Sequence, residues 1–177
     1  EIGGASGGNL IPMAAALPQS EFVCLDPSVR QIEQGRRNAS ALGLRNLRFD
    51  AGGIEDLERK ARFDYVICHG VYSWVEPAVQ DWILRVAGRQ LSPHGVAYVS
   101  YNTYPGWHFR DMLRDLVRFH ARGDAEESLQ HSLDLLRFLT DVNHDSQHPY
   151  ALYMRHARAL LENAVSPGYF VHEYLES

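Results

Sequence analysis

Glycines crowd the first nine residues, which read Glu-Ile-Gly-Gly-Ala-Ser-Gly-Gly-Asn and precede a helical pattern that begins near Leu10. Glycine at a strand-to-helix turn permits positive φ angles and lets the backbone approach a ligand closely. An acid, Asp26, ends the next strand-like run, 18 residues beyond Gly8. A carboxylate there can accept hydrogen bonds from two vicinal hydroxyls, as in nucleotide sites. The pair therefore indicates a site for a nucleoside, with an ordinary loop and a helix cap at Asp26 as the alternative interpretations.

The spacing of these glycines argues against a dinucleotide. The dinucleotide fingerprint is G-x-G-x-x-G, whereas this chain has an acid followed by x-G-x-x-x-G-G, with Gly3, Gly7 and Gly8 at the glycine positions. A Tyr-x-x-x-Lys pair is also lacking, because Lys60 is the only lysine. Both observations disfavour a nicotinamide-dependent oxidoreductase.

The composition excludes several other classes. The chain has 177 residues, of which 45% are hydrophobic and 22% charged, and its net charge of −5 disfavours nucleic acid as the main partner. No apolar run approaches the ~18 residues of a membrane span. Cys24 and Cys68 sit in strand-like runs as small hydrophobes, without zinc or disulfide spacing. We expect no metal site and a reducing, cytoplasmic setting.

Short strand-like runs alternate with helical patterns over roughly the first 105 residues. Helices are predicted from Ser28 to Leu42, where Gly43 supplies the stop, and from Glu76 to Leu91. The strand-like runs are nearly continuously apolar, which is typical of parallel strands buried on both faces. They cover residues 22–25, 47–49, 63–68 and 96–101. The alternation predicts an α/β fold with a parallel sheet flanked by helices.

From residue 107 onward the pattern is helical only. The prediction is therefore two domains: residues 1–117 form the α/β domain, and residues 118–177 begin an all-α appendage. The chain opens on what resembles the end of a strand and closes without a stop signal. We expect both domains to be incomplete at these outer ends.

The acid-x-G-x-x-x-G pattern that starts at Glu1 resembles the first motif of class I S-adenosylmethionine-dependent methyltransferases, which have a Rossmann-like sheet. In that family the acid after the second strand holds the ribose hydroxyls, which implies this role for Asp26. The acid that closes the third strand meets the adenine amine, which implies this role for Asp50. The element after the fourth strand borders the transferred methyl group and corresponds here to residues 68–72. Open α/β sheets bind their ligands at this edge.

The resemblance implies S-adenosylmethionine as the cofactor and S-adenosylhomocysteine as the product. One departure concerns Gly4, because many class I enzymes have Cys or Ala at this position; glycine fits there sterically. The residues implied in cofactor binding are Glu1, Gly3, Gly4, Ser6, Gly8, Asn9, Asp26, Pro27, Asp50, Ala51, His69 and Gly70.

Three unusual strings narrow the resemblance. They are GNLIPM at residues 8–13, HGVYSWV at residues 69–75 and SYNTYPGWH at residues 100–108. Together they resemble a bacterial group in which a class I methyltransferase is followed by a methyltransferase regulatory domain. Some members of that group are protein-lysine methyltransferases that modify outer-membrane proteins. Residues 119–123 resemble the start of the regulatory part and residues 170–175 a motif within it.

Methyl transfer is an in-line displacement, so the acceptor must be aligned with the methyl group at ~3 Å. A lysine amine, with a free pKa of ~10.4, must lose its proton before it attacks. Aromatic side chains near the sulfonium can stabilise its charge. The candidates for these roles are Tyr101, His69, Tyr72, Tyr104 and His108. Packing is the alternative role for each of them.

A protein substrate is the expected partner. A small-molecule acceptor is the alternative within the enzyme class, and a non-catalytic scaffold that binds cofactor weakly or not at all is the alternative outside it. The sequence says nothing of the oligomeric state.

Overall fold

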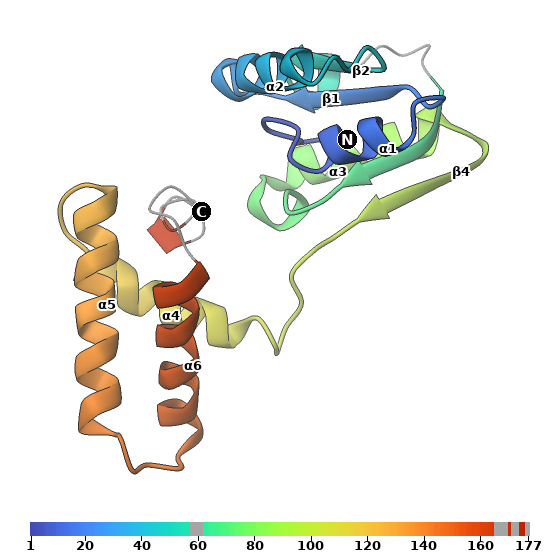
Figure 1. Cartoon of the computed structure of the whole chain (residues 1–177). Coiled ribbons are helices and arrows are strands. Elements are labelled where there is room, and N and C mark those ends of the chain that lie inside the picture. The colour runs from blue at the N-terminus through green and yellow to red at the C-terminus, as the bar shows by residue number, and fades with distance from the viewer. Residues whose placement is uncertain (57–61, 165–169, 171–173, 176–177) are drawn as a thin grey trace. The chain divides into compact units, whose positions relative to one another are not determined.

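The structure is a computed structural model that describes residues 1–56, 62–164, 170, 174 and 175. It falls into two compact units, Glu1–Asn102 and Thr103–Ser177. The first unit contains α1 (Leu10–Ala16), β1 (Phe22–Asp26), α2 (Val29–Ala41), β2 (Leu47–Ala51), the 3-10 turn η1 (Ile54–Asp56), β3 (Phe63–Cys68), the 3-10 turn η2 (Tyr72–Trp74), α3 (Pro77–Gln90) and β4 (Leu91–Val99). The second contains α4 (His108–His120), α5 (Ala125–Val142) and α6 (Pro149–Ala164) (Figure 1).

The described strands form one parallel arrangement in the first unit. β1 pairs with β2, β3 pairs with β4, and both pairs are parallel. Ile2 joins them, because it bridges Leu25 of β1 on one side and Cys68 of β3 on the other. The order is therefore β2–β1–residue 2–β3–β4, which confirms the predicted α/β fold with its parallel, helix-flanked sheet.

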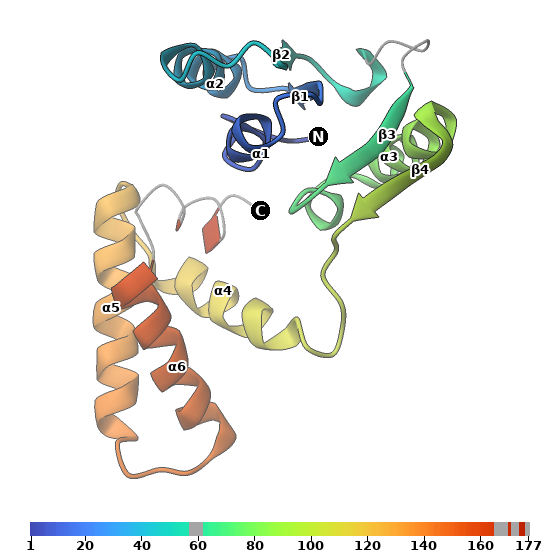
Figure 2. The ribbon, with the colours of Figure 1, turned by 45° about the vertical axis from the view of Figure 1, so that its right-hand side comes forward.

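Helices cover the two halves of this sheet on opposite faces. α1 and α2 pack on the face that carries Cys24 of β1 and Phe49 of β2. α3 packs on the other face, where Ile83 meets Val66 and Cys68 of β3. Figure 2 shows α1 and α2 beside β1 and β2, and α3 beside β3 and β4. Side chains alternate along a strand, so each half of the sheet keeps one face that these helices do not cover.

This arrangement corrects the expectation that the strand-like runs are buried on both faces. Tyr65 of β3 is 71% exposed, and Val96 and Tyr98 of β4 are each 54% exposed. These three side chains share one face, because Tyr65 pairs with Val96 and Ile67 with Tyr98. The reason is that α3 covers only the opposite face.

Local signals in the sequence fix the two ends of α2. Ser28 caps α2 by accepting a hydrogen bond from Gln31 N, and Gly43 follows the helix with a φ of +68°. Both features were predicted. The end of α1 is held by a distant residue, since the Asn46 amide nitrogen donates to the carbonyls of Ala14, Leu17 and Ser20 at 2.9–3.2 Å. The side chain of Asn46 thus joins the end of α1, and the segment that follows it, to the start of β2.

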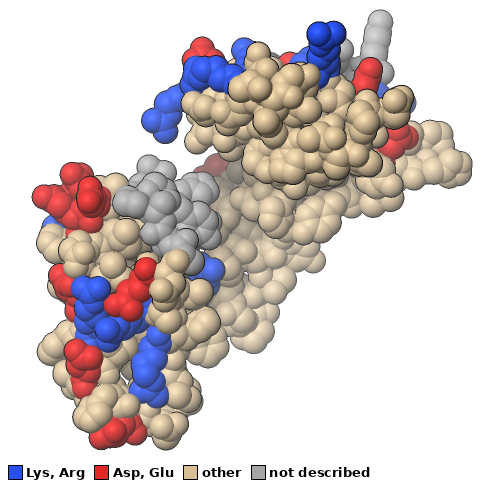
Figure 3. Space-filling view, in the orientation of Figure 1, with Lys and Arg blue, Asp and Glu red and all other residues tan. Residues whose placement is uncertain are grey.

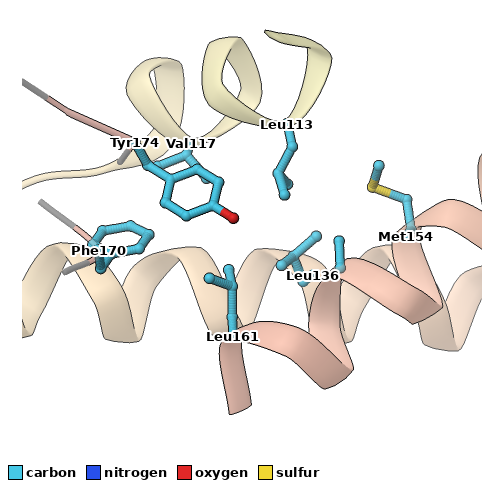
Figure 4. Packing of buried hydrophobic residues seen from close by; sticks show 8 residues of the cluster. Leu113, Val117, Leu136, Met154, Leu161, Phe170 and Tyr174 are labelled. Carbon is cyan, nitrogen blue, oxygen red and sulfur yellow. The ribbon is translucent and has the colours of Figure 1, made fainter. Parts of the chain in front are cut away.

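The second unit has its own apolar core. α4, α5 and α6 contribute Leu113, Leu136 and Met154, each at most 1% exposed. Figure 4 shows these side chains pointing toward one another, together with Phe170 and Tyr174. The helical appendage predicted from the sequence is therefore present.

Charged side chains of the second unit pair with one another on its surface. Arg137 and Arg158 both reach Glu162 at 3.1 Å, and Arg137 also reaches Asp134 at 3.0 Å. Figure 3 shows basic and acidic side chains intermixed here. No helix in the described part of the chain is both long and apolar enough to cross a bilayer.

The division between units falls after Asn102. α4 therefore lies in the second unit, whereas the sequence analysis placed residues up to 117 in the first domain. The physical reason is that Leu113 and Val117 of α4 belong to the same core as α5 and α6. That residues 1–117 form the methyltransferase domain and residues 118–177 begin a second domain stays a prediction.

Candidate cofactor site and acceptor side

The glycine-rich turn, which we define as residues 3–8, leaves the middle of the sheet and leads into α1. Gly3 and Gly7 have φ angles of +70° and +80°, and Ala5 between them has a φ of +47°. Such angles favour glycine. A Cβ on Gly3 would overlap the side chain of Val71, which follows β3. The turn is thus pinned against the neighbouring loop, and only glycine fits at its first position.

Asp26 contacts this turn directly. Its carboxylate accepts one hydrogen bond from Ala5 N at 2.9 Å and another from Ser28 N at 2.8 Å, and the residue is only 9% exposed. The turn and the aspartate therefore lie together, as a shared ligand would require. The cap of α2 is Ser28, and Asp26 supports it by accepting the hydrogen bond of the Ser28 N–H. An ionised carboxylate has about four acceptor positions, so two stay available to a ligand.

Glu1 fits a polar ligand at the same turn. One oxygen, Oε1, accepts from the Asn9 side-chain amide at 3.1 Å, while Oε2 is buried without a hydrogen-bond partner. A buried acceptor without a partner is costly, since it has lost water and gained nothing. A donor supplied by a ligand would satisfy it. Gly8 and Gly70 border open space, since a Cβ on either would meet no atom within 4 Å.

The departure from the family pattern at Gly4 has a structural reason. A Cβ on Gly4 would collide with the sulfur of Cys24, which lies on the neighbouring strand β1. Cys24 is fully buried, and its Sγ lies 3.8 Å from the Ala5 carbonyl. Burial raises the pKa of the Cys24 thiol to about 11. The cysteine therefore stays neutral and occupies the volume that a larger residue at position 4 would need.

The third predicted acid is placed differently from Asp26. Asp50 stands near the end of β2 and pairs with Arg48 through Oδ2 at 2.9 Å. Asp50 is opposite Leu25 in the strand register, whereas Asp26 is opposite Ala51. Because side chains alternate along strands, Asp50 and Asp26 point to opposite faces. Only the second oxygen of Asp50 is outside the pair with Arg48.

The predicted catalytic residues of the first unit gather after β3 and β4. The rings of Tyr72 and Tyr101 are 6.2 Å apart, and the ring of His69 is 5.9 Å from that of Tyr98. Two hydrogen bonds join the loops: Gly70 N donates to the Ser100 hydroxyl at 2.9 Å, and Asn102 N donates to the Ser73 hydroxyl at 2.7 Å. Aromatic side chains thus line the carboxyl ends of both strands.

Tyr104 and His108 form a separate pair in the second unit. Their rings are 4.3 Å apart, and the Tyr104 hydroxyl donates to an oxygen of Asp111 at 2.8 Å. This hydrogen bond raises the pKa of Tyr104 above its ordinary value, because it stabilises the protonated phenol. The structure therefore brings Tyr72 near Tyr101 and Tyr104 near His108, each pair within its own unit.

Sequence reasoning missed several residues that shape the site. Asp111 contacts Tyr104, and Phe49 contacts Gly7. Val71 lies within the string at residues 69–75, but its contact with Gly3 was not predicted. The contacts of Val71 and Phe49 join segments that are far apart in the sequence, so spacing does not mark them. Among the described residues, no three His, Cys, Asp or Glu side chains are grouped so as to hold a metal ion.

Comparison with known proteins gives matches to this arrangement. The family model described as "Methyltransferase domain" matches residues 1–97. Two uncharacterised proteins of Rickettsia prowazekii are 39% and 40% identical to the chain; each match covers 99% of the chain, and 71% and 32% of the respective relative. The structure of PKMT2 from Rickettsia typhi in complex with AdoHcy is 38% identical with a TM-score of 0.86, and the match covers 99% of the chain and 34% of PKMT2. The chain thus spans about a third of the length of PKMT2.

Proposed function

Since this chain belongs to the methyltransferase domain family and has the class I S-adenosylmethionine-dependent fold, we propose that it transfers a methyl group from S-adenosylmethionine to an amine, that of a protein lysine. The observation that carries the proposal is the hydrogen-bonded contact between the glycine-rich turn and Asp26. The chain is also similar, over 99% of its length, to PKMT2 from Rickettsia typhi, whose structure was determined in complex with AdoHcy.

The buried polar groups around the turn suit the cofactor. When bound, S-adenosylmethionine supplies a methyl group activated by the positive charge of its sulfonium. The free acceptor positions of Asp26 suit the ribose hydroxyls, and the unpartnered Oε2 of Glu1 suits a donor on the ligand. The loop after β3, with His69 and Gly70, would border the methyl group. Ser6, Asn9, Pro27, Asp50 and Ala51 complete the proposed cofactor contacts.

The aromatic side chains after β3 and β4 suit a cationic centre and a neutral amine. The ring faces of Tyr72 and Tyr101 can stabilise a nearby positive charge. His69 is exposed and stands at the end of β3, so it can take or relay the proton that a lysine ammonium must lose. We assign His69, Tyr72 and Tyr101 to this acceptor side. Tyr104 and His108 are kept as candidates from the second unit.

The choice of a lysine acceptor rests on PKMT2, whose name is that of a protein lysine methyltransferase, and on the strings at residues 69–75 and 100–108. In the same proposal residues 118–177 begin the regulatory domain, and the protein works in the cytoplasm. The free, buried state of Cys24 and Cys68 supports a reducing compartment.

Two measurements test the proposal in order. Calorimetry of the 177-residue chain should show that it binds S-adenosylhomocysteine. Asp26→Ala should weaken this binding, because it removes the carboxylate oxygens proposed to accept hydrogen bonds from the ribose hydroxyls. Labelled S-adenosylmethionine should then transfer its methyl group to lysine in a bacterial protein fraction. Label found only in the small-molecule or RNA fraction would contradict the protein acceptor, and a lack of cofactor binding would leave the scaffold alternative.

A further inference from the structure

The ring of Phe49 lies between two glycines that are far apart in sequence. Phe49 belongs to β2, is 3% exposed, and faces α1 and α2. A Cβ on Gly7 of the glycine-rich turn would lie 2.7 Å from Phe49 Cζ, and a Cβ on Gly35 of α2 would overlap Cε1 of the same ring. Carbon atoms do not approach so closely, so the ring requires glycine on both sides.

Gly35 has no backbone reason to be glycine. It stands inside α2, where glycine costs ~1 kcal/mol relative to alanine, and its φ is not positive. Its Cβ position is filled by the Phe49 ring instead. Gly35 therefore lowers the stability of α2, but it allows the Phe49 ring to pack directly against the helix.

Gly7, on the other side of the ring, connects the turn to α1. Its N–H donates to the Gly4 carbonyl at 2.8 Å, and its carbonyl accepts from Ile11 N at 2.8 Å. Gly7 thus closes the turn and starts the helix. A displacement of Gly7 would be transmitted to both, because interiors are close-packed and transmit strain.

We infer that Phe49 is a positioning residue for the cofactor: its ring, backed by α2 at Gly35, fixes the place of Gly7 and with it the glycine-rich turn. This inference rests on the proposed function, because the turn is taken as the cofactor site. It adds a buried residue that acts on the site through Gly7 and that no motif marks.

A pair of substitutions on opposite sides of the ring tests it. Gly35→Ala should push the ring toward Gly7 and weaken S-adenosylhomocysteine binding by roughly tenfold, the scale of coupling between residues in contact. Phe49→Leu removes the ring atoms that touch both glycines, so it should loosen the turn and weaken binding by roughly threefold. The double variant should bind more tightly than either single variant, because the added methyl group occupies the vacated space.

Two controls separate positioning from loss of stability. Gly88→Ala is also a glycine replacement in a helix, α3, but its Cβ would meet no atom within 4 Å, so affinity should not change. Ile83→Val changes a fully buried residue of α3 that packs against β3. It should lower the free energy of unfolding by ~1 kcal/mol without changing affinity. Thermal unfolding is measured for every variant without ligand.

The outcomes are distinct. Wild-type affinity in Gly35→Ala, or a double variant that binds no better than Phe49→Leu, would overturn the inference while leaving the proposed function intact. If Gly35→Ala does not fold, the comparison of Phe49→Leu with the double variant decides. A wild-type chain that fails to bind S-adenosylhomocysteine would instead contradict the proposed function, and the inference with it.

Discussion

The two halves of the sheet in the first unit differ in how far their functional groups are fixed before any ligand arrives. Around β1 and β2, Asp26 is buried and both of its oxygens hold backbone N–H groups. Around β3 and β4, His69 and Tyr101 are exposed. The ring of His69 lies 5.9 Å from that of Tyr98, and the ring of Tyr101 lies 6.2 Å from that of Tyr72.

This difference suits the two partners of a transferase. A preorganised site binds its ligand without a further ordering cost, which favours a cofactor used in every turnover. The exposed rings around β3 and β4 are accessible to an acceptor molecule, and the surface of that molecule would cover them when it binds. Changes in the first half should therefore alter cofactor affinity and stability, and changes in the second half should alter turnover.

The largest effect is expected from Gly3→Ala. The new side chain needs a left-handed φ, which costs ~1–2 kcal/mol, and overlaps Val71, which costs ~1–3 kcal/mol more. Urea unfolding should show a loss of about 2–5 kcal/mol, with cofactor binding abolished. Gly8→Ala is the matched control, because its Cβ points into open space, and it should unfold like the wild type. Equal stability of the two variants would mean that the turn is not held as described.

Asp26→Ala should have the next largest effect. It removes two hydrogen bonds that hold the turn and α2, together with the proposed ribose contacts. S-adenosylhomocysteine affinity should fall by about 1–3 kcal/mol, the scale for hydrogen bonds to a charged group. Calorimetry measures this, with Asp50→Ala as the comparison. Asp50 is already paired with Arg48, so its loss should matter less, and the reverse order would place the ribose elsewhere.

Tyr101→Phe tests the other half. The ring stays and only the hydroxyl is lost, so cofactor affinity should be unchanged while kcat falls roughly tenfold, or about 1.4 kcal/mol. Tyr65→Phe is the control, because Tyr65 is also an exposed tyrosine of this half but lies earlier on β3. A parallel fall in affinity and kcat for Tyr101→Phe would indicate a structural tyrosine and break the division between the halves.

The smallest effect compares the two cysteines, one in each half. Burial raises the pKa of both thiols, that of Cys24 to about 11. At pH 8 the folded chain should react with iodoacetamide on the order of a hundredfold more slowly than the unfolded chain, and faster as pH rises toward 11. Cys68 should react several times faster than Cys24, because a backbone hydrogen bond from Tyr72 lowers the pKa of the Cys68 thiol and partly offsets the effect of burial. Mass spectrometry of timed samples measures both rates, and faster labelling of Cys24 would contradict the comparison.

Local features of the fold were predictable because they depend on neighbouring residues. Ser28 and Gly43 mark the ends of α2, and Gly3 and Gly7 of the turn have the positive φ angles that glycine permits. The exposure of Tyr98 was not predictable, because it depends on which face α3 covers.

Long-range contacts in the site left no pattern in the sequence. Gly4 is glycine because of Cys24, and Gly35 because of Phe49. Neither pair is marked by spacing, because the contact arises only when strands and helices from separate segments come together. The glycine-rich turn and the acid that follows it, Asp26, could be predicted from the sequence. The side chains that hold the turn in place could not.

The triple contact of Asn46 has a consequence for how the chain acquires its structure. The three carbonyls that it binds precede it by 26 to 32 residues. During synthesis the end of α1 therefore waits for a long stretch of polypeptide to emerge from the ribosome, and closing that loop carries an entropic cost. The segment that begins with the glycine-rich turn is thus completed only after β1 and α2 have been made.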